Sequence, residues 1–425
     1  MSHLRTLSPR RLTLVVVALL GVALAGTGIA RAALAGGADP PPPRPLAEAL
    51  HDAATASKVA GVTAQVRFAN NLLPAGALPG GEAQSSPLLA GATGRMWLRS
   101  DGRFRLELQS SAGDSQIVSD GREVRFVDPR SKTIYVGAMP ERERGGRRGG
   151  KEHGARGEHG PPSLKEIERG LTRLSRKVNL SGAEPGSVAD RPAYTLRVSP
   201  KRDGGLLGAG EVAWDAARGV PLRAAIYAQG KPEPVIELAT TAIGYDAVAL
   251  SDVDVPTPAG FRVVRLADRP KERGSMDHER GRAKGRSEGV RGLEDVQAKL
   301  PFRLAAPAEL VGLPRRDVRL IEKPEGRTAV VVYGRGLGAI VVAQSEARRG
   351  KGAPGPFGGP EGGRGRDGMH GATPSLPKVS IEGATGTELS TALGTVVSFE
   401  RDGVSHVVGG SIEPVAAEAA ARELR

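Results

Sequence analysis

The sequence predicts an α+β protein in which a curled antiparallel sheet forms a half-barrel wrapped around helices, followed by a smaller C-terminal α+β domain. Three observations lead to this prediction. Many short runs alternate between apolar and polar residues, Asp-Gly dipeptides separate several of them, and few segments have helical spacing. Alternation with a period of two is typical of strands that bury one face, and Asp-Gly favours the tight turns between such strands.

The clearest alternation lies in residues 94–137. Asp-Gly pairs at 101–102 and 120–121 mark two turns, since glycine accepts a positive φ and aspartate tolerates it. Between the turns the apolar phase of one strand is Phe104, Leu106 and Leu108. The opposite phase is rich in arginine and is expected to face water. A sheet of this kind is not stable alone, so something must cover its apolar face.

Two helices are expected beside this sheet. Leu46–Lys58 has leucines on one side, and Ser163–Ser175 begins with a capping box made by Ser163 and Glu166. The first strand is expected at Gly61–Phe68, and a second run of strands extends from Tyr194 to Val264. The order of elements suits one sheet of nine or ten strands curled around the two helices.

Composition shifts divide the chain into segments. Residues 141–162 and 348–377 are rich in Gly, Arg and Pro and are predicted to be disordered loops, and residues 266–299 form a charged linker. The predicted units are therefore a half-barrel domain over residues 46–265 and a small α+β domain over residues 300–425. Pro414–Leu424 is expected to be the terminal helix of the second unit, because proline suits a first helical turn.

The amino terminus has the pattern of an export signal. Arginines at positions 5, 10 and 11 precede a continuous apolar run over residues 12–30, and small-x-small cleavage sites follow. Nineteen helical residues would span about 28 Å, close to a bilayer core, so an uncleaved anchor is the alternative to a cleaved signal peptide within residues 1–35. Residues 36–45 form a Pro-rich spacer. An extracytoplasmic location in the periplasm or cell envelope is expected in either case.

The formal net charge is +13, with a sequence pI of about 10.2, and there is no cysteine. Much of the positive charge lies in the loop-like runs, and no basic patch interleaved with aromatics is visible, so nucleic acid is not an expected partner. An ordinary basic surface and an anionic partner, such as lipid headgroups or cell-wall polymer, both remain open. The lack of cysteine excludes disulfides, zinc–thiolate sites and a lipid-modified cysteine.

A search for catalytic chemistry finds no motif. Gly334, Gly336 and Gly338 resemble part of a dinucleotide fingerprint, but a strand and not a helix is expected next. The His153 and His159 loop repeats are expected to be solvated, and His406 to be structural. We therefore expect a non-catalytic protein without a metal ion or cofactor.

The apolar phase of the strands supplies the candidate ligand-binding residues. They would line a hydrophobic cavity if the helices leave the face open, and would be ordinary core if the helices fill it. The ten candidates are Met96, Leu98, Phe104, Leu106, Leu108, Phe126, Tyr194, Leu196, Trp214 and Ile226.

Five stretches resemble a known family. They are GRMWLRSDGRF (94–104), SDGREVRFVDPRSKTIY (119–135), RPAYTLRV (191–198), EVAWDAARGVPL (211–222) and PAGFRVV (258–264). Their rhythm resembles the LolA/LolB/LppX family of envelope carriers, including the amino-terminal domain of RseB/MucB-like regulators of sigma factors. The resemblance covers about half of the chain, from residue 46 to residue 264.

The resemblance implies an incomplete β-barrel around helices with a hydrophobic cavity, and partners that are lipid or lipoprotein acyl chains. It therefore implies an outer membrane lipoprotein carrier-like, lipid- or lipopeptide-binding protein. The alternative is an RseB-like envelope-stress regulator that binds a membrane anti-sigma factor. A third alternative is a wall-associated structural protein that binds polysaccharide through its basic loops.

Overall fold

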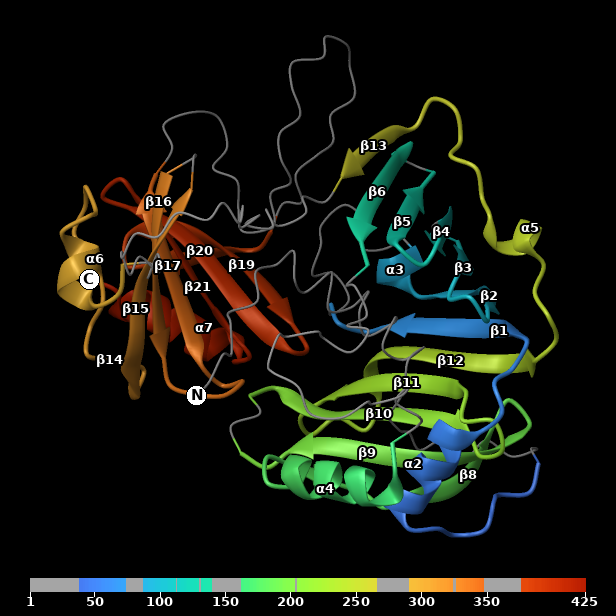
Figure 1. The fold of residues 1–425 in the computed structure, drawn as a ribbon. Coiled ribbons are helices and arrows are strands. Elements are labelled where there is room, and N and C mark those ends of the chain that lie inside the picture. The colour runs from blue at the N-terminus through green and yellow to red at the C-terminus, as the bar shows by residue number, and fades with distance from the viewer. Residues whose placement is uncertain are drawn as a thin grey trace, which may run out of the picture.

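The computed structural model describes residues 38–73, 87–111, 113–129, 131–139, 162–202, 205–265, 290–323, 326–347 and 376–425 of the 425-residue chain. Within these residues the strands form a sheet of thirteen strands and a sheet of eight (Figure 1). The predicted fold class is confirmed: a curled antiparallel sheet with helices is followed by a smaller α+β unit. The predictions for residues 1–35, 141–161, 266–289 and 348–375 lie outside the described residues.

The first unit contains two helices of ten and eleven residues, two helices of four residues and thirteen strands in the described part of the chain. In chain order they are α2 (Leu46–Thr55), β1 (Gly61–Asn70), α3 (Pro87–Ala90), β2 (Ala92–Arg99), β3 (Phe104–Ser110), β4 (Gly113–Ser119), β5 (Glu123–Asp128), β6 (Thr133–Ala138), α4 (Leu164–Leu174), β7 (Val178–Leu180), β8 (Glu184–Val188), β9 (Arg191–Pro200), β10 (Leu207–Asp215), β11 (Pro221–Ala228), β12 (Pro234–Gly244), α5 (Leu250–Val253) and β13 (Arg262–Arg265).

The strands of this sheet follow the order β13-β6-β5-β4-β3-β2-β1-β12-β11-β10-β9-β7, and β8 pairs with β9. The predicted meander is the run from β2 to β6, and β1 joins it to the second meander by pairing with β12. Most pairs are antiparallel, but β13 lies parallel to β6 at the edge. The sheet exceeds the nine or ten strands expected, because the short strands β7, β8 and β13 extend its two ends.

The Asp-Gly turns are confirmed. Gly102 and Gly121 have φ of 88° and 87°, and Asp101 and Asp120 accept hydrogen bonds from backbone N–H groups after the turn. These bonds lower the pKa of both carboxyls, although burial opposes the effect. The local sequence therefore determines where the meander reverses direction.

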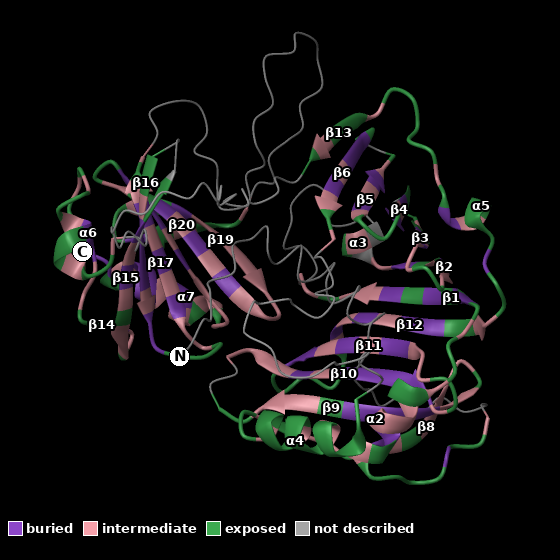
Figure 2. Ribbon diagram, in the orientation of Figure 1, coloured by how far each residue is buried: buried purple, intermediate pink, exposed green. Residues whose placement is uncertain are grey.

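The two long helices of this unit do not play the same part. Helix α2 contributes Ala49 to a core cluster, with Leu46 and Leu50 packed around it. The capping box of α4 is confirmed, since Glu166 accepts from the N–H and the hydroxyl of Ser163. However, α4 buries none of its residues (Figure 2). The expectation that both helices cover the sheet is therefore wrong for α4.

The second unit has its own sheet, in the order β14-β15-β16-β17-β21-β20-β19-β18. Its elements are α6 (Leu293–Gln297), β14 (Glu309–Leu310), β15 (Leu313–Lys323), β16 (Gly326–Tyr333), β17 (Ile340–Glu346), β18 (Lys378–Ile381), β19 (Ala384–Thr391), β20 (Gly394–Arg401), β21 (Val404–Gly410) and α7 (Pro414–Glu423).

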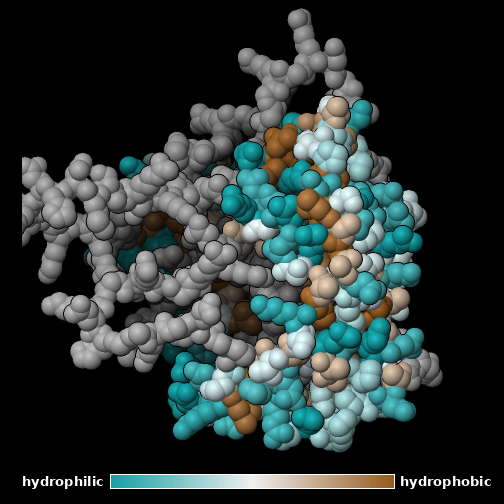
Figure 3. Space-filling view, turned by 45° about the vertical axis from the view of Figure 1, so that its right-hand side comes forward, coloured by the Kyte–Doolittle hydropathy of each residue, from teal (hydrophilic) through white to brown (hydrophobic). Residues whose placement is uncertain are grey.

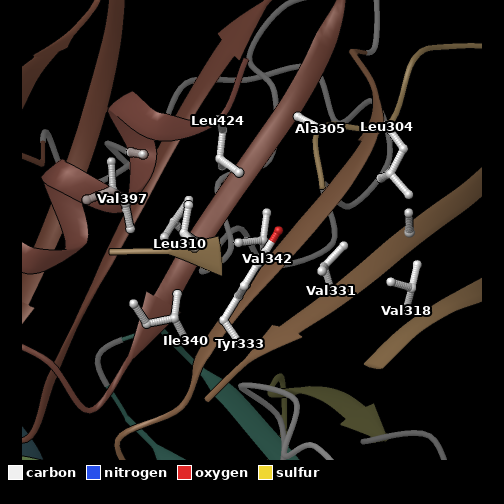
Figure 4. Packing of buried hydrophobic residues seen from close by; sticks show 14 of the residues in the cluster. Leu304, Ala305, Leu310, Val318, Val331, Tyr333, Ile340, Val342, Val397 and Leu424 are labelled. Atoms are coloured by element: carbon white, nitrogen blue, oxygen red, sulfur yellow. The ribbon is translucent and has the colours of Figure 1, made fainter. Parts of the chain in front are cut away.

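One face of the second sheet carries a dense apolar core. Tyr333 and Val342 of neighbouring strands meet Leu424 from the end of the terminal helix (Figure 4). Ala417, Ala420 and Ala421 bring helix α7 close to the sheet, because their side chains are small. Burial raises the pKa of Tyr333 to about 12, so this phenol stays neutral.

The second unit begins earlier than the sequence suggested. Val296 is fully buried in its core, and Val290 and Leu293 pack against the same cluster. The N–H groups of Leu320 and Gly292 also join residues 290–292 to strand β15. Residues 290–299, predicted to be linker, thus pack as part of this unit, and its start moves from Leu300 to Val290.

Hydrogen bonds between loops join the two units. The N–H of Leu206 donates to the carbonyl and hydroxyl oxygens of Ser411, at 3.2 and 2.9 Å, and the N–H of Ala392 donates to Leu72 at 2.8 Å. Gly205 has φ of 55°, and a Cβ there would lie 2.3 Å from the Ser411 carbonyl oxygen. This close approach requires glycine.

Candidate functional site: the inner face of the half-barrel

The strand register places all ten predicted lining residues on one face of the thirteen-stranded sheet, here called the inner face. Residues paired directly across antiparallel strands project from the same face, and so do alternate residues along a strand. The pairs run Phe126–Ile117–Leu106–Met96–Ala64 and, from β1 onward, Phe68–Leu238–Ala224–Val212–Leu196.

Six of the ten residues lie on β2, β3 and β5. Met96, Phe104, Leu106 and Leu108 are buried in one cluster, and the half-buried Leu98 and Phe126 pack against it. Helix α3 lies over this region and contacts β1, β3 and β4. It has only four residues, so it covers much less of the sheet than an ordinary helix does. This part of the inner face is called the meander half.

Three of the other four residues lie beneath α2. Tyr194, Leu196 and Trp214 form a cluster with Ala49, and the rings of Tyr194 and Trp214 are 6.1 Å apart. The Tyr194 hydroxyl donates to the carbonyl of Pro42 at 2.7 Å, which ties residues before α2 to the sheet. These three residues are therefore packed core, while Ile226 is half-buried on the same face.

The candidate set missed the strands that connect the two halves. Val62, Ala64, Val66 and Phe68 of β1 are buried in the same cluster as Leu106, and Leu238 of β12 packs against it. The alternation over Gly61–Phe68 did predict strand β1. Its neighbour β12 follows β1 by some 170 residues in the chain, so their pairing was not visible in the sequence.

The opposite, outer face carries a row of alternating charges, here called the charge ladder. Arg67 lies 3.1 Å from Glu237, Glu237 also binds Arg223, and Glu211 lies 3.5 Å from Arg223 and 2.6 Å from Arg197. Glu211, Glu237 and Arg223 are only 3, 5 and 6% exposed. Such buried charges persist in proteins when they are paired.

Small residues explain how these long side chains are buried on a sheet surface. Ala225 is paired with both Glu237 and Glu211, and Ala239 is paired with both Arg67 and Arg223. Between alanines the charged chains can lie flat and reach one another.

A tyrosine completes the ladder. Arg223 donates to the Tyr227 hydroxyl at 3.1 Å, and the Arg197 guanidinium lies 4.6 Å from the Tyr227 ring centre. Burial opposes the charge of Arg223, but Tyr227 and Glu237 outweigh it and raise its pKa. Burial also raises the pKa of Tyr227. Arg223 is therefore charged at neutral pH, and the Tyr227 phenol beside it is neutral.

The arginine-rich side of the meander is not simply wet, as the sequence suggested. Residues 246–261, here called the strap, cross it between β12 and β13. Arg99 donates to the carbonyl of Val248 at 2.8 Å, Arg105 to Asp252 at 3.3 Å and Arg125 to Val255 at 3.0 Å. Figure 3 shows this side of the half-barrel as a mixture of hydrophilic and hydrophobic surface.

The strap also leads into the strand that covers the edge of β6. Phe261 packs against Val127, Ile134 and Val136 on the outer side, and β13 then pairs with β6. An unpaired strand edge invites association with other chains, and a covered one does not. Arginines that looked like a solvated face thus hold a structural segment.

The described segments contain no group of three His, Asp or Glu side chains placed to hold a metal ion. In the part of the chain that the structure describes, no helix combines the length and apolar character needed to cross a membrane. The side chains that the inner face presents are apolar, so the contact it offers is with apolar groups.

Comparisons with known proteins find structural similarity only. No family model matches the chain, and no curated protein sequence matches it. A crystal structure of MucB in complex with MucA(peri) is similar with a TM-score of 0.38 and 16% identity, over 89% of this chain and 96% of MucB. The structure of the Pseudomonas aeruginosa MucA/MucB complex gives 0.39 and 16%, over 88% and 96%.

A LolA superfamily protein from Nitrosomonas europaea is similar over 50% of this chain and 98% of its own, with a TM-score of 0.21 and 10% identity. These structures are of the kinds that the sequence resemblance named. At such scores and identities the likeness does not establish what this protein binds. The half-barrel is established by the register of its own strands.

Proposed function

We propose that this protein is an exported, non-catalytic envelope protein that binds an apolar ligand, a lipid or lipopeptide acyl chain, on the meander half of the inner face. The observation that carries the proposal is the continuity of one apolar face over the whole sheet, from Phe126 to Leu196. Helix α2 occupies this face at β9 and β10, whereas the meander half has the four-residue α3.

The energetics are sufficient for tight binding without catalytic groups. Each buried methylene is worth about 0.8 kcal/mol, so an acyl chain of about 15 carbons supplies on the order of 12 kcal/mol before the costs of ordering. Half-buried Leu98 and Phe126 are the residues best placed to gain burial from a ligand, since the fully buried ones already have their contacts.

The test is mass spectrometry of organic extracts from residues 36–425, which contain every residue that the structure describes. The protein is to be secreted and purified without detergent. A lipid present at about one per chain supports the proposal. A stable protein free of lipid contradicts it and indicates that the inner face is a filled core.

Neighbouring residues on β2 offer a matched pair of variants. Leu98 lies on the inner face, and Trp97, also half-buried, lies on the outer face beside Arg105. Leu98→Gln is expected to lower the lipid content several-fold while Trp97→Gln leaves it unchanged. Equal lipid content in two folded variants would show that the ligand does not use this face.

The second candidate function is regulation through a membrane anti-sigma factor, in the manner of RseB. The feature that favours it is a second folded unit joined to the half-barrel by loop hydrogen bonds at Ser411 and Leu72. MucB, whose structure is similar, was crystallised with MucA. Capture of the protein by the extracytoplasmic part of an anti-sigma factor encoded beside its gene would support this function.

Gly205→Val separates the two candidates. The added side chain collides with Ser411 and is expected to disrupt the contact between the units. Loss of anti-sigma binding with full lipid content would favour regulation that needs both units. If the variant keeps both anti-sigma binding and lipid content, the result would support acyl-chain binding by the half-barrel alone.

A further inference from the structure

Helix α4 carries an apolar stripe whose two ends are exposed and whose middle residues, Ile167 and Leu171, are half-buried. Leu164, Ile167, Leu171 and Leu174 recur at spacings of three and four, which places them on one side of the helix. Leu164 is 37% and Leu174 44% exposed, and neither belongs to a core cluster. The helix packs beside α2 and is mostly exposed in Figure 2.

The other side of α4 is basic. Lys165, Arg169 and Arg173 recur every four residues, and Arg176 and Lys177 follow the helix. All five are exposed, and none of them forms an ion pair within the described residues. Only two acidic residues share this segment, and one of them, Glu166, caps the helix.

An apolar stripe with exposed ends and a basic side on the same helix are the two features of helices that lie in a membrane interface. The leucines enter the boundary of the acyl chains, while lysine and arginine extend to the headgroups. Basic residues near an anionic surface add attraction that salt screens. We propose that α4 docks this protein on a membrane surface that contains anionic lipid.

The charge of α4 favours a lipid surface, and not the protein's own sheet, as the partner of its apolar stripe. The sheet beneath α2 is already packed by Ala49, Leu46 and Leu50, so it needs no second helix. An anionic surface complements both the stripe and the unpaired cations, and can accommodate the exposed ends Leu164 and Leu174. The docking helix is separate from the inner face, so this inference does not depend on the proposed function.

The absence of cysteine makes a direct test available. Leu174→Cys in the full chain can be labelled at that one position with an environment-sensitive fluorophore. The matched control is Leu250→Cys on α5, because Leu250 is 45% exposed, nearly the same as Leu174. Residues 1–37 are the same in both proteins, so binding through the amino terminus affects both labels equally.

The probe is a phosphatidylcholine vesicle with or without phosphatidylglycerol. We expect a blue shift at position 174 with phosphatidylglycerol vesicles, lost at high salt, and no shift at position 250. Adding Arg169→Gln and Arg173→Gln should weaken the response about fivefold per charge removed. Circular dichroism checks that these surface variants keep their fold.

Four results would overturn the proposal. The label at position 174 does not respond to vesicles, or it responds equally with pure phosphatidylcholine, or positions 174 and 250 respond alike. A shift at position 174 that appears only with an added envelope protein would mark α4 as a protein contact instead, and would also overturn docking on lipid.

Discussion

The two faces of the thirteen-stranded sheet bury different kinds of side chain. The inner face uses apolar side chains such as Leu106 and Trp214, whose burial removes nonpolar area from water. The outer face, over β9 to β12 and β1, buries Glu211, Arg223 and Glu237 and pairs them with one another. Both faces come from the same alternating strands.

The difference shows which face can accept a ligand. A paired ionic lattice is sensitive to the loss of any member, because an uncompensated buried charge is costly. Apolar contacts are non-directional and can be exchanged for contacts with an acyl chain. The inner face is thus suited to an exchangeable partner, and the charge ladder to a fixed structure.

The largest effect is expected where the inner face is covered by a helix. Trp214→Ala should lower the free energy of unfolding by about 4 kcal/mol, because a large buried ring leaves a cavity beneath α2. Phe126→Ala should cost less, since Phe126 is only half-buried. Urea denaturation of the two variants measures the difference. Equal losses of unfolding free energy would contradict the view that α2 covers its part of the inner face more fully than the meander half is covered.

The charge ladder should be nearly as sensitive. Glu237→Leu leaves Arg223 buried beside a single remaining acid and should cost about 3 kcal/mol. The double variant Glu237→Leu, Arg223→Met removes the pair and should recover most of that loss. If the double variant is as unstable as the single one, the ladder is not maintained by the pairing of its charges.

The second unit offers a contrasting case, a buried imidazole that forms no ion pair with the described residues. His406 is 6% exposed, and burial, helped by the charge of Arg401, lowers its pKa to about 4, with Asp402 acting in the other direction. Its Nδ1 atom has no hydrogen-bond partner. The imidazole, stacked on Phe399, is therefore neutral in the folded protein at neutral pH.

Acid should destabilise this unit through His406. The unfolded chain takes up a proton near pH 6.5, but the folded chain does so only near pH 4, so stability is lost as pH falls between these values. The loss should approach 3 kcal/mol, from about 1.4 kcal/mol for each unit of pKa. His406→Phe should flatten the plot of unfolding free energy against pH in this range. An unchanged plot would mean that other groups cause the acid sensitivity.

The smallest effect is expected at the strap. Arg125→Ala removes hydrogen bonds to Val255 and Thr257 and should cost about 1 kcal/mol. Hydrogen exchange in residues 248–257 should rise, while Arg265→Ala, an exposed control paired with Glu123, should leave the exchange unchanged. No change in either variant would mean that packing of Phe261, and not the arginines, holds the strap.

Sequence reasoning went furthest where the structure is local. The turns at 101–102 and 120–121, the alternation of β3 and the capping box of α4 follow from neighbouring residues, and all are confirmed. It failed for the arginines at 99, 105 and 125, because the same alternating pattern fits a solvated face and a face covered by a distant segment. The carbonyls they bind lie about 130 to 150 residues away.

By itself the sequence determined the fold class, the turns and the apolar phase of each strand, since these depend on side-chain type and spacing over a few residues. Only the tertiary structure decided which strands pair, and with them that all ten candidate residues share one face. The pairing of β1 with β12 joins the two meanders. Such long-range pairs depend on complementary faces that no local pattern contains. The apolar stripe of α4 is likewise visible in the sequence, but what contacts it is not.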